Sequence, residues 1–194
     1  VKDAKLIDVI SYSEANELAN FGANILHAKT IIPLIEKNIP LRICNTFNDD
    51  NEGTLIGPKT DNGGIKSLSV LDNMALINLE GRGLLGKVGV DMRIFRALGQ
   101  NGISVGIVSQ GSSERGIGLV VDASLADKAK KVLDIEFETD YSSQDINQIT
   151  VVKDVSVISI VGMDLSSFHK PFNALAKNQV IPLLFNNTVT GKNV

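Results

Sequence analysis

Residues 74–122 read MALINLEGRGLLGKVGVDMRIFRALGQNGISVGIVSQGSSERGIGLVVD, and their pattern decides the fold. The run up to Gly81 alternates apolar and more polar residues, which predicts a half-buried strand. A glycine-rich loop then opens a helix from Val88 to Leu98, and Gly102 follows its end. The apolar residues of this helix recur at helical spacing and are Val90, Ile94, Phe95 and Leu98.

The residues after this helix complete the pattern. Residues 103–108 and 117–121 are rich in β-formers and predict two strands, joined by a polar turn over 110–116. A last helix is expected over 124–137, with its apolar side chains on one face. The order strand, helix, strand, strand, helix is that of a split βαβ sandwich, with two helices on one sheet. The expected fold class is α+β.

Composition excludes several classes of function. The chain has 194 residues, of which 43% are hydrophobic, enough for one large or two small cores. Its net charge of −3 gives no general attraction to nucleic acid or to an anionic membrane. The one cysteine, Cys44, excludes an internal disulfide, and no His/Cys cluster has metal-site spacing. Without a signal-peptide pattern or a long apolar run, we expect a cytoplasmic protein with no metal, nucleic acid or membrane partner.

The first 57 residues have a different pattern. Ser11 and Glu14 have the spacing of a capping box for a short helix. A second helix is expected over 30–38, with Pro33 in its first turn. Strands are expected over 41–47 and 54–56, and these elements are too few to close a core alone. The stretch 58–64, PKTDNGG, reads as a linker.

An internal repeat organises the rest of the chain. Residues 65–81 match residues 146–162 at a constant offset, and residues 95–110 match residues 172–187 at a slightly smaller one. The second copy therefore has a shorter loop in place of the glycine-rich segment. It stops at Val194, where the first copy still has a strand and a helix to come. We expect this sequence to be a piece of a longer protein.

Two nucleotide-binding motifs are present in part. Gly81, Gly83 and Gly86 spell G-x-G-x-x-G between a strand and a helix, as in a dinucleotide-binding turn. However, the next strand ends at Gln110 without a carboxylate for a ribose, and the chain turns back as a hairpin. The G-x-x-x-x-G-K pattern ending at Lys87 is followed by Val88, where a phosphate loop needs Ser or Thr. Both interpretations are weak.

Nucleophilic and acid–base catalysis are also poorly supported. The histidines His27 and His169 are isolated in the sequence. Ser112 and Ser113 lie in a polar turn with no histidine near them. We therefore expect no catalytic residue in this chain.

A glycine-rich loop before a helix has a further physical use. Free N–H groups and the positive end of the helix dipole favour a carboxylate there. The Gln110 amide can donate and accept, which suits a hydroxyl group. Asp91, or carbonyl groups over 104–106, can receive an amino group. Together these groups describe a pocket for a zwitterionic amino acid; the alternative is that the glycines only shape a tight turn and Gln110 is a surface residue.

Two stretches resemble one known family. GLLGKVGVDMRIFRALGQNGISV and SQGSSERGIGLVVD, within residues 83–122, resemble the regulatory ACT domain of aspartate kinases, most closely of the bifunctional aspartokinase–homoserine dehydrogenase type. Residues 10–57 resemble the end of the amino acid kinase domain of the same enzymes, through ISYSEA, FGANILH, NT and GTLIG. The likeness covers nearly the whole chain in the family's order. The D-P-R stretch that precedes this region in the family is missing.

The resemblance implies a division into domains. It assigns 1–57 to the C-terminal αβ remnant of an amino acid kinase domain, 58–64 to a linker, 65–138 to a first ACT domain and 146–194 to a truncated second one. Tandem ACT domains have the ferredoxin-like order βαββαβ. Because one ACT unit is inserted in the other in similar enzymes, the strand over 65–71 is free to pair within the second unit.

The resemblance also implies a function. The parent enzyme would phosphorylate L-aspartate with ATP and magnesium at the head of lysine, threonine and methionine biosynthesis, and a homoserine dehydrogenase could follow. This fragment is not expected to be catalytic or to hold a cofactor itself. It would bind an end-product amino acid as a feedback inhibitor and form a homodimer or higher oligomer through ACT–ACT pairing. Gln110 matches a glutamine linked to threonine sensing, so threonine is favoured over lysine.

The resemblance names the contacts as well. A weak nucleotide contact is implied at Asn24 and Ile25, although the family has lysine where this chain has Asn24. The implied effector-binding residues are Gly86, Lys87, Val88, Gly89, Val90, Asp91, Ser104, Val105, Gly106, Gln110, Ser112 and Ser113. Two alternatives to effector binding stay open. The first is a structural ACT dimerisation module without a live ligand site, and the second, less favoured, is a dinucleotide-binding module.

Overall fold

The computed structural model describes residues 5–22, 25–48, 50–58, 64–84, 87–111, 116–162, 164 and 166–187. The chain forms two compact units. The first contains residues 1–70, 158–182 and 187–194, and the second contains residues 71–157 and 183–186. Two long strands, β4 (Ser67–Glu80) and β7 (Gln148–Val161), contribute residues to both units.

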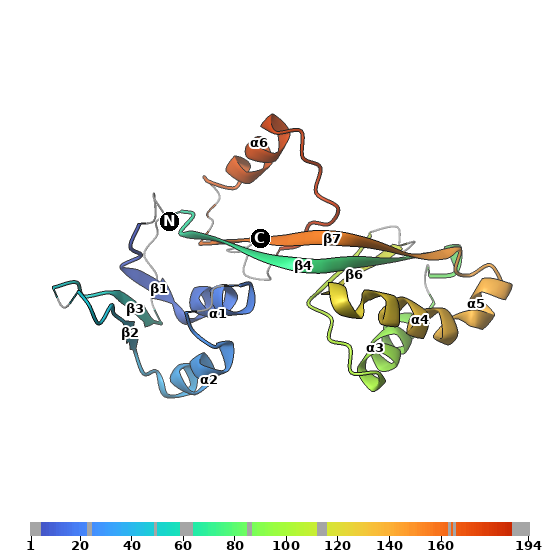
Figure 1. Ribbon diagram of the computed structural model, residues 1–194, viewed down its shortest axis with the longest axis horizontal. Helices are drawn as coiled ribbons and strands as arrows, with labels where there is room; N and C mark the ends of the chain where they lie inside the picture. Colours follow the sequence, from blue (N-terminus) through green and yellow to red (C-terminus); the bar gives the residue numbers. More distant parts are fainter. Residues whose placement is uncertain are drawn as a thin grey trace. The chain divides into compact units, whose positions relative to one another are not determined.

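The first unit contains a small three-stranded sheet (Figure 1). In order along the chain its elements are β1 (Val9–Ser11), α1 (Tyr12–Asn20), α2 (Ala28–Lys37), β2 (Leu41–Ile43), β3 (Thr54–Gly57) and, after β7, α6 (His169–Lys177). The strand order is β1-β3-β2, with β1 parallel and β2 antiparallel to β3. Its core contains Ile10, Tyr12, Ala15, Ile31 and Ile56.

The predicted helix starts in this unit need one adjustment. The capping box is confirmed: the Ser11 side chain accepts from Glu14 N, and Glu14 accepts from Ser11 N. The second helix begins at Ala28, two residues earlier than expected, because the ring of His27 accepts from Lys29 N and acts as the N-cap.

The strand expected over 41–47 was too long, since β2 ends at Ile43. The chain turns immediately afterwards. The Asn45 side chain accepts from Phe47 N, and its carbonyl accepts from Asn48 N. An asparagine that bonds the backbone two residues ahead favours a turn over a strand.

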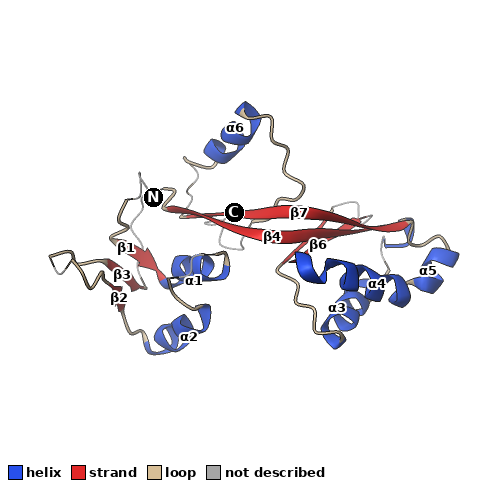
Figure 2. Cartoon of the chain, viewed as in Figure 1, coloured by secondary structure: helices blue, strands red, loops and turns tan. Residues whose placement is uncertain are grey.

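The second unit is a ferredoxin-like α/β sandwich. Its four-stranded sheet has the order β5-β6-β4-β7, with β6 antiparallel to both β4 and β5. Figure 2 shows the helices of this unit together on one side of these strands. In chain order after β4 its elements are η1 (Arg82–Leu84), α3 (Val90–Gln100), β5 (Ile107–Gln110), β6 (Gly116–Asp122), η2 (Ala123–Leu125), α4 (Ala126–Glu136) and α5 (Glu138–Ser142).

The core of this unit follows from alternation in the strands and helical spacing in the helices. Alternate residues of β4 and β6 face α3 and α4, which follows the rule that side chains on a strand alternate between its faces. The fully buried members include Ile77, Leu79, Leu119, Leu133 and Phe137. This places the predicted apolar helix positions Val90, Ile94 and Leu98 in the core, whereas Phe95 is 44% exposed.

Two boundaries in this unit differ from expectation. The strand expected over 103–108 starts only at Ile107. Ile103 instead closes α3, because its N–H donates to Leu98 O, and its side chain is buried. The helix expected over 124–137 consists of η2 and α4, which ends at Glu136, and a separate short helix, α5, follows Phe137.

The internal repeat is visible in detail. β4 and β7 have 14 residues each and occupy equivalent positions of the two copies. Asn73 and Asp154, at equivalent positions within them, both have positive φ, 59° and 58°. Glu80 O accepts from Asn147 N at 2.7 Å, and at the equivalent place Val161 O accepts from Lys66 N at 2.9 Å. The start of each long strand thus pairs with the end of the other.

The copies diverge after their helices. Both helices end at asparagines, Asn101 and Asn178, whose side chains donate to the carbonyls of Ala97 and Ala174. After α6, the described residues up to 187 contain no strand that matches β5. Within the described ranges, no helix has the length and apolar character needed to cross a membrane.

Candidate functional site

The turn after β4 is shaped by a close backbone approach. A Cβ on Gly81 would lie 2.0 Å from Asp145 O and 2.7 Å from Ile146 Cα. Only glycine fits where another backbone segment of the same chain approaches this closely. This glycine is therefore explained by packing within the protein, and it needs no bound nucleotide. The antiparallel pairs of the sheet also differ from the parallel sheet of a dinucleotide-binding fold.

The start of α3 has the features expected of an anion site. Gly89 is the N-cap with φ 91°, and a Cβ built there meets nothing within 4 Å. Because glycine has no side chain, Gly89 cannot cap the N–H groups of the first turn with a side-chain hydrogen bond. The first N–H groups of a helix have no intrahelical acceptor, and the helix dipole is positive at this end. Val90 is buried, and Asp91 is exposed.

The other expected residues have varied surroundings. Val88 is fully exposed, Ser104 is exposed, and Val105 packs against the core of the second unit. Gly106 N donates to Val120 O at 2.8 Å, which brings this segment onto the edge of the sheet. Gln110 is exposed at the end of β5, opposite Ile117. Gly86, Ser112, Ser113 and Asn24 lie outside the described residues.

Lys87 is held by two carboxylates that we did not predict. Its Nζ lies 2.9 Å from Asp140 Oδ1 and 3.0 Å from Asp145 Oδ2. These hydrogen bonds raise the pKa of Lys87. The pKa of Asp145 is lowered, chiefly by Lys87 and then by Ser143. The charge of Lys87 is therefore balanced by the protein itself.

Asp140 is the centre of this group of charges. It is 5% exposed and also accepts from Arg93, with Nη2–Oδ2 at 2.7 Å. The Arg93 hydrogen bond, followed by that of Lys87, lowers the pKa of Asp140 to about 2 despite its burial. Arg93 additionally bonds Glu136 Oε1 at 2.9 Å, and its guanidinium stacks 4.2 Å from the centre of the Phe137 ring. We name Lys87, Arg93, Glu136, Asp140 and Asp145 the ion cluster.

The sequence gives little signal for the ion cluster. Glu136 and Asp140 are four residues apart, but α4 ends at Glu136 and Asp140 belongs to α5, so they do not share one helix. Lys87 and Arg93 flank the start of the predicted helix. The sequence pattern does not predict that Arg93 contacts Glu136 and Asp140, because more than 40 residues separate Arg93 from either carboxylate.

The kinase side offers little on which to build a nucleotide site. Ile25 is 75% exposed and has no group that can hold a phosphate or magnesium. Among the described residues, no group of three or more His, Cys, Asp or Glu side chains could hold a metal ion.

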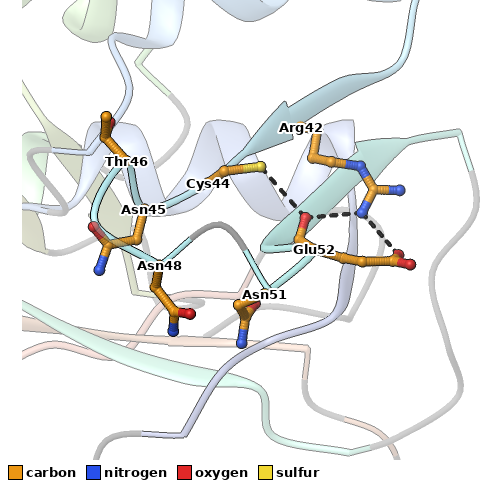
Figure 3. Close-up of a pocket in the computed structure, with 7 residues that line it drawn as sticks. All are labelled: Arg42, Cys44, Asn45, Thr46, Asn48, Asn51 and Glu52. Carbon is orange, nitrogen blue, oxygen red and sulfur yellow. Dashed lines mark hydrogen bonds and ion pairs between the residues drawn. The ribbon is translucent and has the colours of Figure 1, made fainter.

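A polar hollow is present beside β2 (Figure 3). Its arginine, Arg42, already donates to Glu52 O at 2.8 Å and to Glu52 Oε2 at 3.1 Å. Cys44 donates to the same carbonyl at 3.4 Å. The arginine of the hollow is therefore already engaged by Glu52. Its lining residues are Arg42, Cys44, Asn45, Thr46, Asn48, Asn51 and Glu52.

Comparison with known proteins identifies both parts of the chain. Residues 77–137 match the ACT domain, and residues 1–45 match the amino acid kinase family. The bifunctional aspartokinase/homoserine dehydrogenase of Haemophilus influenzae is 42% identical over 164 residues, which are 84% of this chain and 20% of that protein. The chain spans about a fifth of the length of such relatives.

Solved structures of aspartate kinases are similar to this chain over its whole length. The aspartate kinase of Clostridium acetobutylicum, described as an allosteric enzyme, has a TM-score of 0.83 at 26% identity, with 46% of that chain covered. E. coli aspartokinase III in complex with lysine and aspartate, in the T-state, has a TM-score of 0.69 at 25% identity, with 43% covered.

Proposed function

This chain belongs to the aspartate kinases, and we propose that it binds an end-product amino acid that inhibits the parent enzyme. It contains the end of the amino acid kinase domain and the ACT region that follows. The observation that carries the proposal is the open, glycine-capped start of α3 within the ACT domain. The parent enzyme would phosphorylate L-aspartate with ATP and magnesium. We assign no catalytic residue to this chain.

The geometry at α3 supports a ligand with a carboxylate. The N–H groups of the first turn and the helix dipole favour a negative charge next to Gly89. Lys87 adds no free cation, because Asp140 and Asp145 balance it. A small zwitterion suits such a place better than a phosphate. E. coli aspartokinase III, a relative of this chain, has been solved with lysine bound.

Threonine is our preferred effector over lysine. The exposed Gln110 amide at the end of β5 can donate to and accept from a hydroxyl group. The effector contacts that we propose are those expected from the sequence, with Gly89, Val90 and Gln110 at the centre. ACT–ACT pairing into a homodimer or higher oligomer, and a cytoplasmic location, stay predictions.

Calorimetry of the full-length enzyme with threonine, lysine and methionine tests the proposal. We expect saturable heat with threonine, together with inhibition of the kinase at the same concentrations. Lysine as the binding partner would keep the site and correct its specificity. No binding by any of the three would overturn the proposed function.

One observation favours a second candidate, a structural ACT module without a ligand. The ion cluster engages Lys87 and Arg93, on either side of the start of α3, through the protein's own carboxylates, so neither cation depends on an effector for a partner. In that case Gln110→Ala would leave the feedback inhibition of the full-length enzyme unchanged.

A further inference from the structure

A buried ion pair joins the start of β4 to the amino acid kinase part within the first unit. Lys66 Nζ lies 3.2 Å from Glu14 Oε2, and the two side chains are only 7% and 3% exposed. The same Nζ donates to Val9 O at 3.2 Å. Lys66 belongs to the ACT region by sequence repeat, whereas Val9 and Glu14 belong to β1 and α1.

Each partner of this pair has a second structural role. Glu14 Oε2 also accepts from Ser11 N at 2.7 Å and so completes the capping box of α1. The backbone N–H of Lys66 donates to Val161 O, at the end of β7. One residue pair therefore connects the helix start of the kinase part with the paired ends of β4 and β7.

The path of the Lys66 side chain depends on a glycine. A Cβ on Gly162 would lie 2.7 Å from Lys66 Cγ and 3.0 Å from Gly64 O, and Gly162 has φ 83°. Gly162 is the repeat equivalent of Gly81, where a neighbouring chain also approaches closely. In both copies, the glycine that follows the long strand leaves space for the segment that precedes the other long strand.

A buried pair of this kind resists partial movement. Separating two desolvated charges, or removing one of them, leaves an uncompensated charge in a poorly solvated place. A shift of β4 relative to α1 therefore requires either that α1 follows or that the pair breaks. Coupling between two sites needs an element whose arrangement both sites can bias, and this pair connects the ACT region to the kinase part within the first unit.

We propose that the Lys66–Glu14 ion pair transmits the effector-bound state of the ACT region to the kinase part. The proposal rests on the proposed function, and it names the contact through which inhibition acts. Loss of the pair separates binding from inhibition: the effector still binds at α3, while the kinase no longer responds.

The test uses the full-length enzyme with three variants. Lys66→Met keeps the length of the side chain without its charge, and Glu14→Gln keeps the shape and an acceptor for Ser11. Lys153→Met is the matched control, because Lys153 pairs with Asp127 at 2.8 Å but both side chains are exposed. For each protein, calorimetry gives the dissociation constants of threonine and lysine, and a kinase assay gives the concentration for half-inhibition.

We expect Lys66→Met and Glu14→Gln to keep the dissociation constant within about threefold and to raise half-inhibition at least tenfold. Lys153→Met should behave as wild type in both. Variants that are inhibited like wild type would overturn this inference and leave the proposed function standing. A wild-type enzyme that binds neither amino acid would overturn both.

A second measurement covers the case in which both variants fail to fold. Hydrogen exchange of the wild-type enzyme, with and without the inhibiting amino acid, reports on the backbone around the pair. We expect changed protection at residues 9–14 and 66–70 when the effector binds. Unchanged protection there would overturn the inference.

Discussion

The ammonium group of Lys87 and the carboxylate of Asp140 lie 2.9 Å apart, although 53 residues separate them in the sequence. Asp140 is buried and Lys87 is 41% exposed, so the pair lies at the edge of the core of the second unit. It connects Lys87, just before α3, to Asp140 of α5. The stability of the proposed effector site therefore depends on Asp140, which is not itself one of the proposed effector contacts.

Asp140→Asn should destabilise the fold. The change removes the partner of both Lys87 and Arg93 in a mostly buried place, which costs about 2–3 kcal/mol of unfolding free energy. Denaturant unfolding of this chain measures the loss. The matched control is Asp127→Asn, since Asp127 is exposed and its pair with Lys153 should contribute less than about 1 kcal/mol. Equal effects of the two variants would contradict the role given to Asp140.

The pH dependence of the free energy of unfolding should also reveal the contribution of Asp140. Because the folded-state pKa of Asp140 is about 2, below the usual 3.8, its ionised form stabilises the fold above its unfolded pKa. This contribution is lost as the pH falls from about 4 through 2. Asp145, whose pKa is also lowered, acts in the same direction. Unfolding between pH 5 and pH 2 should therefore depend less on pH in Asp140→Asn than in wild type; parallel curves would refute this.

Gly81→Ala should destabilise the protein, whereas Gly99→Ala should not. The Cβ at position 81 would overlap Asp145 O, and overpacking of this kind costs about 1–3 kcal/mol. Gly99 lies in α3 with nothing within 4 Å of its Cβ, so alanine there should stabilise by about 0.5–1 kcal/mol. Thermal unfolding of both variants decides. A stable Gly81→Ala protein would mean that the 145–146 segment does not lie against β4.

Gln110→Ala should weaken effector binding without unfolding the protein. Gln110 is exposed, so its truncation leaves the core intact, while one lost hydrogen bond lowers affinity up to about tenfold. Calorimetry with threonine on the full-length enzyme measures the effect, and Gln100→Ala, at the exposed end of α3, is the control. An unchanged affinity for threonine would remove Gln110 from the site.

Much of the fold could be predicted because it follows from local pattern. The capping box at Ser11 needs only a spacing of three residues, and the repeat predicted that β7 would copy β4. Boundaries were less predictable where a residue serves two purposes. Ile103 has the composition of a strand residue but closes α3, and Asn45 ends β2 by bonding its own turn.

The candidate site was predictable only in part. The glycine at position 89 could be found because a helix start before an apolar face has a recognisable pattern. The ion cluster and the Lys66–Glu14 pair could not, since their partners are 40 or more residues apart and surface-type charges give no pattern for burial. Long-range pairing is set by the packing of complete elements, which a local pattern does not contain.

The most direct test of the effector site is a crystal structure of the full-length enzyme grown with threonine. Our account predicts threonine at the start of α3, with its carboxylate within hydrogen-bond distance of the N–H groups that follow Gly89 and its hydroxyl at Gln110. Threonine bound at a place that includes neither residue would contradict the account.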